Sequence, residues 1–504
     1  MANERDTYAV AVIGAGFSGV AAAIKLLEAG ITDFVVLERA NRVGGTWRDA
    51  VYPGAEVDVP SWLYSLSFAP NPYWSSVNSP AAEIFSYIEK IVRDFGLTPH
   101  LRFGVDVSRV EFDAVSGSWR ISAADGYSLS ARAVIAADGL LANEHWPDIP
   151  GRKQFIGRQI HTAHWARDYD FTDKRVAVIG TGASAVQIIP ELVKVAGHVT
   201  VFQRTPAWVI PRLNAQVPIP VRNLFHRFPA VQRAVRSGLF VIYEALTFAL
   251  VWLTPLTRIA ETIAELHLRA KVRDRELRGQ LRPNYHIGCK RPLITSAFYP
   301  ALQRDNATLI PHAVIEITQN TVRAADGTEH PVDCIVHATG YSVGNRGSSF
   351  EVIGTDGRVL GDQWAHGMTG YKSVNVAGFP NLFWTMGPNA FGHSSELLFI
   401  EEQVQYAVRG IREILNRNLR VLDVQPDAQD EHNRELQRKL RSTTFNSGCH
   451  SWYLSEGGYN GMMFPGSVTA YRRQMSTFES HHYTMIPVAA TANPVETIQY
   501  QRNE

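Results

Sequence analysis

The sequence has few cysteines and no paired-cysteine motif. The only three, Cys289, Cys334 and Cys449, lie far apart in a chain of 504 residues. A thiol-based oxidoreductase would need a closely spaced pair, so that class is excluded, and we expect no disulfide framework. Sparse cysteines are typical of proteins in a reducing compartment, and the predicted location is the cytoplasm.

Neither sign of charge is in excess. The 49 basic and 48 acidic residues give a net charge of +1. This balance leaves no basic field to hold nucleic acid or an anionic membrane by charge alone. The N-terminus lacks the basic and apolar segments of a leader, so no signal peptide is expected.

Metal-binding patterns are also missing. No HExxH motif occurs in the sequence. Neither the pair His161 and His164 nor the pair His481 and His482 has partners at metal-site spacing. We therefore predict no metal site.

Only one apolar run is nearly long enough to span a bilayer, and it extends from Leu239 to Leu256. It contains Glu244, Pro255 closes it, and arginines flank it on both sides. We therefore expect a buried or tunnel-lining helix in place of an integral membrane span.

A strand, a glycine turn, a helix and a second strand occur in this order twice. The first copy extends from Tyr8 to Leu37 around the turn GAGFSG, and the second from Arg175 to Phe202 around GTGASA. Such a unit places backbone N–H groups and a helix N-terminus against a pyrophosphate. Two copies predict an α/β fold with two Rossmann-like dinucleotide-binding domains.

The ends of the second strands distinguish the two sites. Glu38 and Arg204 each lie 24 positions after the first glycine of their turn. A carboxylate accepts hydrogen bonds from a free ribose and repels a 2′-phosphate, whereas a guanidinium attracts one. The first site is therefore interpreted as the FAD site and the second as the NADPH site. The alternative for Arg204 is a solvated surface arginine.

The domain organisation follows from these two units. We predict a first FAD-binding segment at residues 1–149 and an NADP-binding domain at 150–342. Arg- and Leu-rich helical periodicity predicts an insertion in that domain at about 213–287. A second FAD-binding segment follows at 343–504, with a mobile loop and a C-terminal tail. The tail, from His481 to Glu504, has no clear pattern and is expected to be loosely held.

Further motifs carry a family resemblance. They are Gly45-Thr-Trp47 with Tyr52-Pro-Gly54 and Asp58; Phe155, Gly157, His161 and Trp165; Gly288-Cys-Lys-Arg-Pro292; Gly387 to His393; and Ser451-Trp-Tyr453. Together they resemble the flavin-dependent class B monooxygenases, and within them the Baeyer–Villiger monooxygenases, over almost the whole chain. Ala166 departs from the usual Pro or Asp after Trp165, and the first Ala-Thr-Gly-like turn reads Ala137-Asp-Gly139.

The resemblance implies an activity and its cofactors. An enzyme of this family uses FAD, NADPH and O₂ to convert a ketone to an ester or lactone through a C4a-peroxyflavin. Arg291 is the expected catalytic residue, because its permanent charge would stabilise the deprotonated peroxide. Asp58 is expected to orient Arg291 and to balance its charge. The alternative for Asp58 is a helix cap or a turn residue.

The remaining predicted site residues bind cofactor. Lys290 is the expected further contact to the 2′-phosphate, or else a surface charge. Trp452 resembles the tryptophan of a loop that closes over the nicotinamide, or else is a core anchor. The full set is Gly14, Gly16, Ser18, Gly19, Glu38, Arg39, Gly45, Thr46, Trp47, Tyr64, Gly180, Gly182, Ala183, Ser184, Arg204, Thr205, Lys290 and Trp452.

Other functions stay open beside this hypothesis. N- or S-oxygenation uses the same cofactors with a protonated peroxide. Enzymes of that kind usually have an aromatic–basic pair where this chain has Trp165-Ala166, so Trp165 favours the Baeyer–Villiger reaction. An uncoupled NADPH oxidase and a non-catalytic flavin sensor are further alternatives. For His161, a packing or domain-linking role is favoured over proton transfer.

Overall fold

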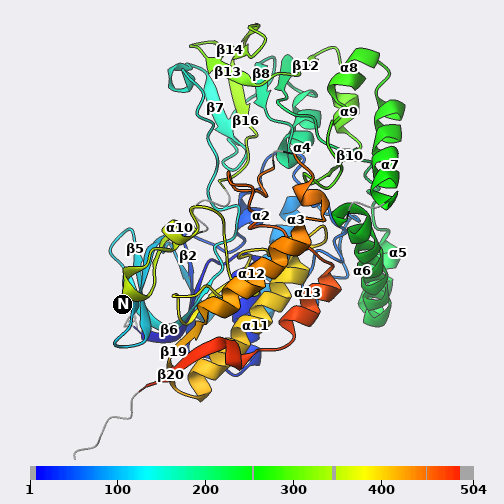
Figure 1. Cartoon of the computed structure of the whole chain (residues 1–504). Helices are drawn as coiled ribbons and strands as arrows, with labels where there is room; N and C mark the ends of the chain where they lie inside the picture. The colour runs from blue at the N-terminus through cyan, green and yellow to red at the C-terminus, as the bar shows by residue number, and fades with distance from the viewer. Residues whose placement is uncertain (1–6, 253–254, 343–347, 450, 489–504) are drawn as a thin grey trace, which may run out of the picture.

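The computed structural model describes residues 7–252, 255–342, 348–449 and 451–488. An eight-stranded sheet is the centre of its first nucleotide unit (Figure 1). The order is β17-β4-β5-β6-β1-β2-β3, with β18 paired to β6. The strands are β1 (Thr7–Ile13), β2 (Phe34–Glu38), β3 (Leu101–Phe103), β4 (Val107–Asp113), β5 (Ser118–Ala123), β6 (Ser128–Ala136), β17 (Glu351–Ile353) and β18 (Leu382–Trp384).

The centre of this sheet is parallel and buried on both faces. β1 pairs in parallel with β2 and with β6, and every residue of β2 is buried. Near-continuous apolar runs such as FVVLE are typical of strands that are covered on both sides. The helices of this unit are α1 (Phe17–Glu28), α2 (Thr46–Asp49), α3 (Ala81–Asp94), α10 (Leu360–Gln363), α11 (Glu396–Asn416), α12 (Pro426–Leu440) and α13 (Val468–Met475).

The late part of the chain completes the first unit. α11 packs against α1, and β17 and β18 join the edge and the middle of the sheet. Thus the segment after the second nucleotide unit returns to the first one. The domain boundaries themselves stay predictions.

The second unit has a five-stranded parallel sheet in the order β12-β9-β8-β16-β7. In Figure 1 it lies above the first sheet. Its elements are β7 (Arg158–His161), β8 (Arg175–Ile179), α4 (Ala183–Leu192), β9 (His198–Phe202), α9 (Phe298–Ala301), β12 (Ala307–Ile310) and β16 (Cys334–His337). A small sheet of β13 (Val314–Ile317), β14 (Thr321–Ala324) and β15 (Glu329–Pro331) packs beside it.

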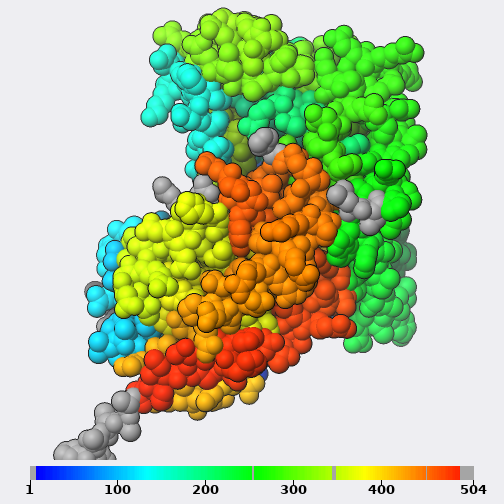
Figure 2. Space-filling model, in the orientation of Figure 1, coloured from blue at the N-terminus to red at the C-terminus, as the bar shows by residue number. Residues whose placement is uncertain are grey.

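Four helices lie within the predicted insertion. They are α5 (Ile219–Arg227), α6 (Pro229–Val251), α7 (Pro255–Lys271) and α8 (Arg275–Gln280), between the paired strands β10 (Val209–Ile210) and β11 (Leu293–Ile294). Asp274 caps α8, because its carboxylate accepts the N–H groups of Glu276 and Leu277. Figure 2 shows these helices along one edge of the molecule, in green.

The prediction of one buried or tunnel-lining helix from Leu239 to Leu256 is wrong in its extent and in its burial. α6 ends at Val251 and α7 begins at Pro255, so the run crosses two helices. Only 11% of the most apolar 18-residue window of α6 is buried. The run is apolar all round, but only one side of α6, with Thr247 and Leu250, has protein to pack against. By length and composition alone, α6 is one helix that could cross a membrane.

The prediction of a loose tail from His481 is also wrong for its first part. β20 (Tyr483–Pro487) pairs antiparallel with β19 (Leu419–Val424). Tyr483 is buried, and its hydroxyl lies 2.9 Å from that of Tyr406. No local pattern predicted this strand, and its pairing partner β19 lies far earlier in the chain. Residues 489–504 lie outside the described part.

The expectation of no disulfide is contradicted as well. Cys289 and Cys449 are joined across 160 residues of sequence, and Cys334 is free and buried. The fold brings the two segments together where Gly288 approaches the side chain of Thr444. Spacing along the chain carries no information about such a contact. The bond ties the segment before Lys290 and Arg291 to the loop before Trp452.

Trp119 gives a test of the packing in the first unit. It is fully buried, and its indole N–H donates to the carbonyl of Pro380 at 2.8 Å. We expect Trp119→Ala to lower the free energy of unfolding by about 3–5 kcal/mol, measured by urea denaturation. The control is Val115→Ala, at a side chain that is 85% exposed. Equal stability of the two variants would contradict this packing.

Candidate active site

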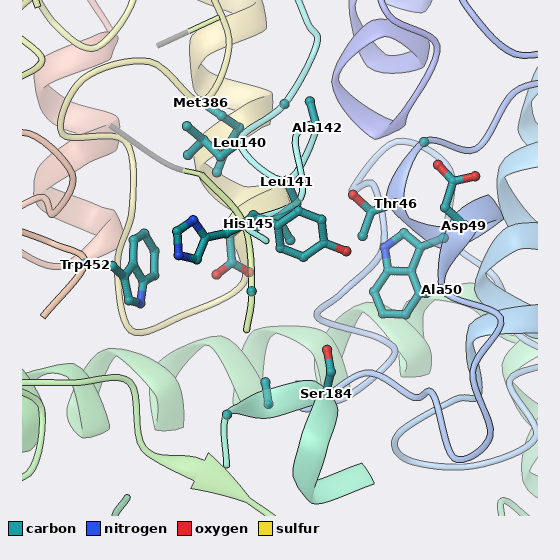
Figure 3. Close-up of a pocket in the computed structure, with 18 of the residues that line it drawn as sticks. Thr46, Asp49, Ala50, Leu140, Leu141, Ala142, His145, Ser184, Met386 and Trp452 are labelled. Atoms are coloured by element: carbon teal, nitrogen blue, oxygen red, sulfur yellow. The ribbon is translucent and has the colours of Figure 1, made fainter. Parts of the chain in front are cut away.

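A cavity of about 1000 Å³ is lined by residues from both nucleotide units. Figure 3 shows Thr46, Ser184 and Trp452 reaching it from different sides. Every site residue predicted from the sequence lines this cavity except Gly19. Gly19 instead packs α1 onto the turn, since a Cβ there would lie 1.8 Å from the carbonyl oxygen of Gly14.

The two glycine turns have the same geometry. Gly14 has φ +103° and Gly180 has φ +108°, and a Cβ on either would lie 2.5 Å from a carbonyl oxygen, of Ala137 or of Ala338. Only glycine tolerates this approach at positive φ. α1 and α4 begin directly after these turns. Their N-terminal N–H groups are therefore placed as a dinucleotide pyrophosphate requires, and both turns fit such a ligand.

Glu38 ends β2 and is held by three donors. Its carboxylate accepts the N–H of Ala15 at 2.9 Å, the N–H of Ala40 at 3.0 Å and Nη1 of Arg48 at 2.8 Å. These contacts fix the carboxylate at the cavity wall, where a ribose hydroxyl would be recognised. Arg48 is a cavity residue that the sequence analysis missed, although it directly follows the Gly45–Trp47 motif.

Trp47 and Tyr64 form one unit beside the first turn. The indole N–H of Trp47 donates to the hydroxyl of Tyr64 at 3.0 Å, and the rings pack edge to face. Arg39 lines the same side of the cavity and donates to the carbonyl of Ala142. These residues fit the predicted role in holding FAD.

Two cations lie beside the second turn. Arg204, Thr205 and Lys290 all line the cavity. Burial and then the charge of Arg204 lower the pKa of Lys290. Within the described residues, neither cation forms an ion pair with a carboxylate. A bound phosphate would relieve their mutual repulsion, so the arrangement fits the 2′-phosphate of NADPH.

Arg291 is held by carboxylates on two sides. Its Nη2 lies 3.1 and 3.0 Å from the two carboxylate oxygens of Asp58, and its Nη1 lies 2.9 Å from Oε1 of Glu396. The Arg291 side chain is 34% exposed, and all three groups line the cavity. The sequence predicted the partner Asp58. It missed Glu396, whose only signal is an acidic residue at the start of α11, shortly after the Gly387–His393 motif.

Burial and neighbouring charges shift the pKa values of Arg291, Glu396 and His393. Asp58 and then Glu396 raise the pKa of Arg291, so the guanidinium stays charged. Burial raises the pKa of Glu396, although Arg291 opposes that shift. Burial and the charge of Arg291 lower the pKa of the neighbouring His393 to about 3, so this imidazole is neutral near pH 7. Of Arg291 and His393, only Arg291 is therefore positively charged near pH 7.

His161 and Trp452 differ in their exposure to the cavity. His161 ends β7, is buried against Trp146 and does not line the cavity. This position fits its interpretation as a packing residue. Trp452 lines the cavity, is 46% exposed and meets the ring of Phe391 edge to face. It is therefore not a core anchor.

Two Rossmann-like units that share one cavity define a flavoprotein of the class that binds two dinucleotides. Residues 11–225 match the family model described as pyridine nucleotide-disulphide oxidoreductase. A Baeyer–Villiger monooxygenase of Streptomyces coelicolor is 42% identical, over 95% of this chain and 92% of that protein. One of Pseudomonas aeruginosa is 37% identical, over 96% and 93%. The chain belongs to the Baeyer–Villiger monooxygenase family.

Solved structures agree with this assignment. An oxidized steroid monooxygenase bound to NADP has a TM-score of 0.84 and 28% identity, over 96% of this chain and 100% of that one. A cyclohexanone monooxygenase from Rhodococcus sp. Phi1 bound to NADP⁺ has a TM-score of 0.86 and 26% identity, with the same coverage. The predicted α/β fold and the prediction of an FAD-containing, NADPH-dependent enzyme of this family are confirmed.

Arg204 provides a test of the NADPH site. We expect Arg204→Gln to raise KM for NADPH by about tenfold or more, because a charge-assisted bond to phosphate is lost. KM for NADH should stay unchanged. Arg167→Gln, at an exposed arginine of the same unit outside the cavity, is the control. An unchanged NADPH-to-NADH preference would make Arg204 a solvated surface residue.

Glu396 provides a second test, as a positioning residue for Arg291. Glu396→Gln keeps the shape and removes the charge, and we expect kcat to fall about tenfold with flavin still bound. Because burial raises the pKa of Glu396, its protonation should contribute an acid limb to the pH profile of kcat. The variant should lack this limb. A profile that keeps the limb would assign it to another group.

Proposed function

We propose that the protein uses NADPH and O₂ to insert one oxygen atom into a ketone, giving an ester or a lactone. One observation carries the proposal: a permanently charged Arg291, clamped by two carboxylates, lies in the cavity that both glycine turns share. When bound, FAD would activate oxygen and NADPH would supply the hydride. Every other contribution comes from side chains and backbone of this chain.

The residues around the cavity divide into two binding sets. We assign the first turn, Glu38, Trp47 and Tyr64 to FAD, and the second turn with Arg204, Thr205 and Lys290 to NADPH. The roles rest on the matched turn geometry and on the opposite charges at Glu38 and Arg204. Trp452 would cover the nicotinamide side and exclude water, because a half-exposed indole in a loop is free to close over a ligand.

Arg291 is the proposed catalytic residue. Negative charge develops on oxygen when a ketone carbonyl is attacked, and a preorganised guanidinium lowers the energy of that charge. Asp58 and Glu396 hold the guanidinium from two sides, so it need not reorient during the reaction. His393 is neutral and adds no competing charge.

The charge of Arg291, held by Asp58 and Glu396, favours the ketone reaction over the alternative functions. N- or S-oxygenation prefers a protonated, electrophilic oxygen donor, which a permanent cation disfavours. An oxidase that only releases hydrogen peroxide has no need of a charge at the substrate position. A flavin sensor has no need of Arg204 and Lys290. The ketone reaction is therefore proposed first, and heteroatom oxygenation second.

The substrate and the location are also proposals. The relatives are named for steroid and cyclohexanone substrates, and we propose a small-molecule ketone for this chain without choosing between those sizes. The proposed location is the cytoplasm.

The experiment is a product analysis. The protein is incubated with NADPH, isotopically labelled O₂, a panel of ketones and one thioether, and we expect an ester or lactone with a single labelled oxygen. We expect Arg291→Ala to keep its flavin and to lose at least about a hundredfold in ester formation. Arg120→Ala, at an exposed position of β5, is the control. Ester formation by the Arg291 variant at the wild-type rate would refute its role.

A further inference from the structure

Exposed apolar side chains are concentrated in the helical insertion. Of 23 large hydrophobic residues that are exposed in the described part of the chain, 12 lie between Ile219 and Leu266. That segment is about a tenth of the protein. Single exposed hydrophobics are normal, whereas a cluster of this kind marks an interaction surface.

The outer side of α6 has no charge over four turns. Val241 is 64% exposed, and Ile242 and Phe248 are each 54% exposed. Between Ser237 and Val251 the only charged residue is Glu244. Its carboxylate faces inward and accepts the N–H groups of Val468 at 2.8 Å and Thr469 at 3.1 Å. The exposed side of this helix is therefore apolar and lacks the charge that usually keeps a surface helix soluble.

α7 carries a second apolar stripe. Leu256, Ile259, Ile263 and Leu266 are 48%, 55%, 48% and 59% exposed. Their spacing of three or four residues places them on one side of the helix. α6 and α7 contact each other and lie along the same edge of the molecule (Figures 1 and 2). We call the exposed sides of these two helices the helical face.

The charge around the helical face is positive. The segment 219–273 contains eight arginine or lysine residues and three glutamates, a net charge of +5 against +1 for the whole chain. All three glutamates have partners within the protein. Glu244 accepts the two N–H groups named above, and Glu261 accepts the N–H of Ile287. Glu265 pairs with Arg269 and Arg282. Arg227, Arg233, Arg258 and Lys271 are exposed. An apolar face with basic residues at its borders complements the acyl chains and headgroups of an anionic bilayer.

The charge also decides between occupants. A second copy of this chain would bring one positive segment against another, which is unfavourable. α6 is held to the protein on its inner side, where Gln232 donates to the carbonyl of Asn71 and Arg236 donates to that of Ser65. A helix held to the protein on one side in this way is not free to cross a membrane.

We infer that the helical face of α6 and α7 is a docking surface for an anionic lipid bilayer, to which the protein binds peripherally. The whole-chain net charge of +1 predicted no such binding, because it averages the positive charge of this segment with the charges of the rest of the chain. Docking does not depend on the reaction proposed above. It would hold the enzyme beside a pool of lipid-soluble ketones.

The test is vesicle flotation of the FAD-loaded protein. Phosphatidylcholine vesicles are compared with vesicles that also contain phosphatidylglycerol. We expect binding to the anionic vesicles that weakens as salt is raised, and little binding to phosphatidylcholine alone. Absence of binding to the anionic vesicles would overturn the inference.

Matched variants locate the surface. Phe248→Glu with Ile263→Glu should lower vesicle binding by at least about tenfold, with unchanged flavin content. Arg233→Glu with Arg258→Glu should also weaken binding, and it leaves the apolar stripes intact. Val115→Glu with Ile156→Glu, at two other exposed hydrophobics, is the control and should bind as the wild type does.

Two results with these variants would overturn the inference. One is equal vesicle binding by the helical-face variants and the control. The other is a dimer in sedimentation analysis that the Phe248 and Ile263 changes dissociate, with no vesicle binding, which would assign the helical face to a second copy. A loss of ketone oxygenation with vesicle binding retained would bear only on the proposed function.

Discussion

The clamp on Arg291 is the interaction on which the site depends. Arg291 lies before β11, Asp58 in the loop after α2, and Glu396 at the start of α11. Each partner comes from a different part of the chain, so the guanidinium is in place only when the two units and the returning segment are assembled. A partly buried cation without its carboxylates would be costly, and the clamp therefore links folding of the site to its electrostatics.

The cavity exists because the two nucleotide units face one another across it. Each unit presents a glycine turn whose first residue lies against the carbonyl of the residue that follows a neighbouring strand. The disulfide between Cys289 and Cys449 joins the Arg291 segment to the loop of Trp452. The segments that carry Arg291 and Trp452, the residues proposed to stabilise charge and to close the cavity, are thus connected covalently.

Much of the fold could be predicted from local patterns. The glycine turns, the strands beside them, Glu38 and Arg204 are set by short-range sequence, and in the structure both turns and both residues line one cavity. Arg48 was missed because its role depends on the direction of its side chain, which donates to Glu38. Glu396 was missed because its partner Arg291 lies far away along the chain. The burial of α6, the pairing of β20 with β19 and the disulfide were predicted wrongly for the same reason.

The sequence by itself determined the two glycine turns, the charge that follows each and the family motifs, because these depend on residue type at fixed local spacing. Only the tertiary structure decided which groups hold Arg291, which cysteines meet and which side of α6 is left exposed. Those features depend on contacts between segments that lie hundreds of residues apart, or on how much neighbouring protein covers a helix. Local periodicity records that a helix is apolar, but not what it packs against.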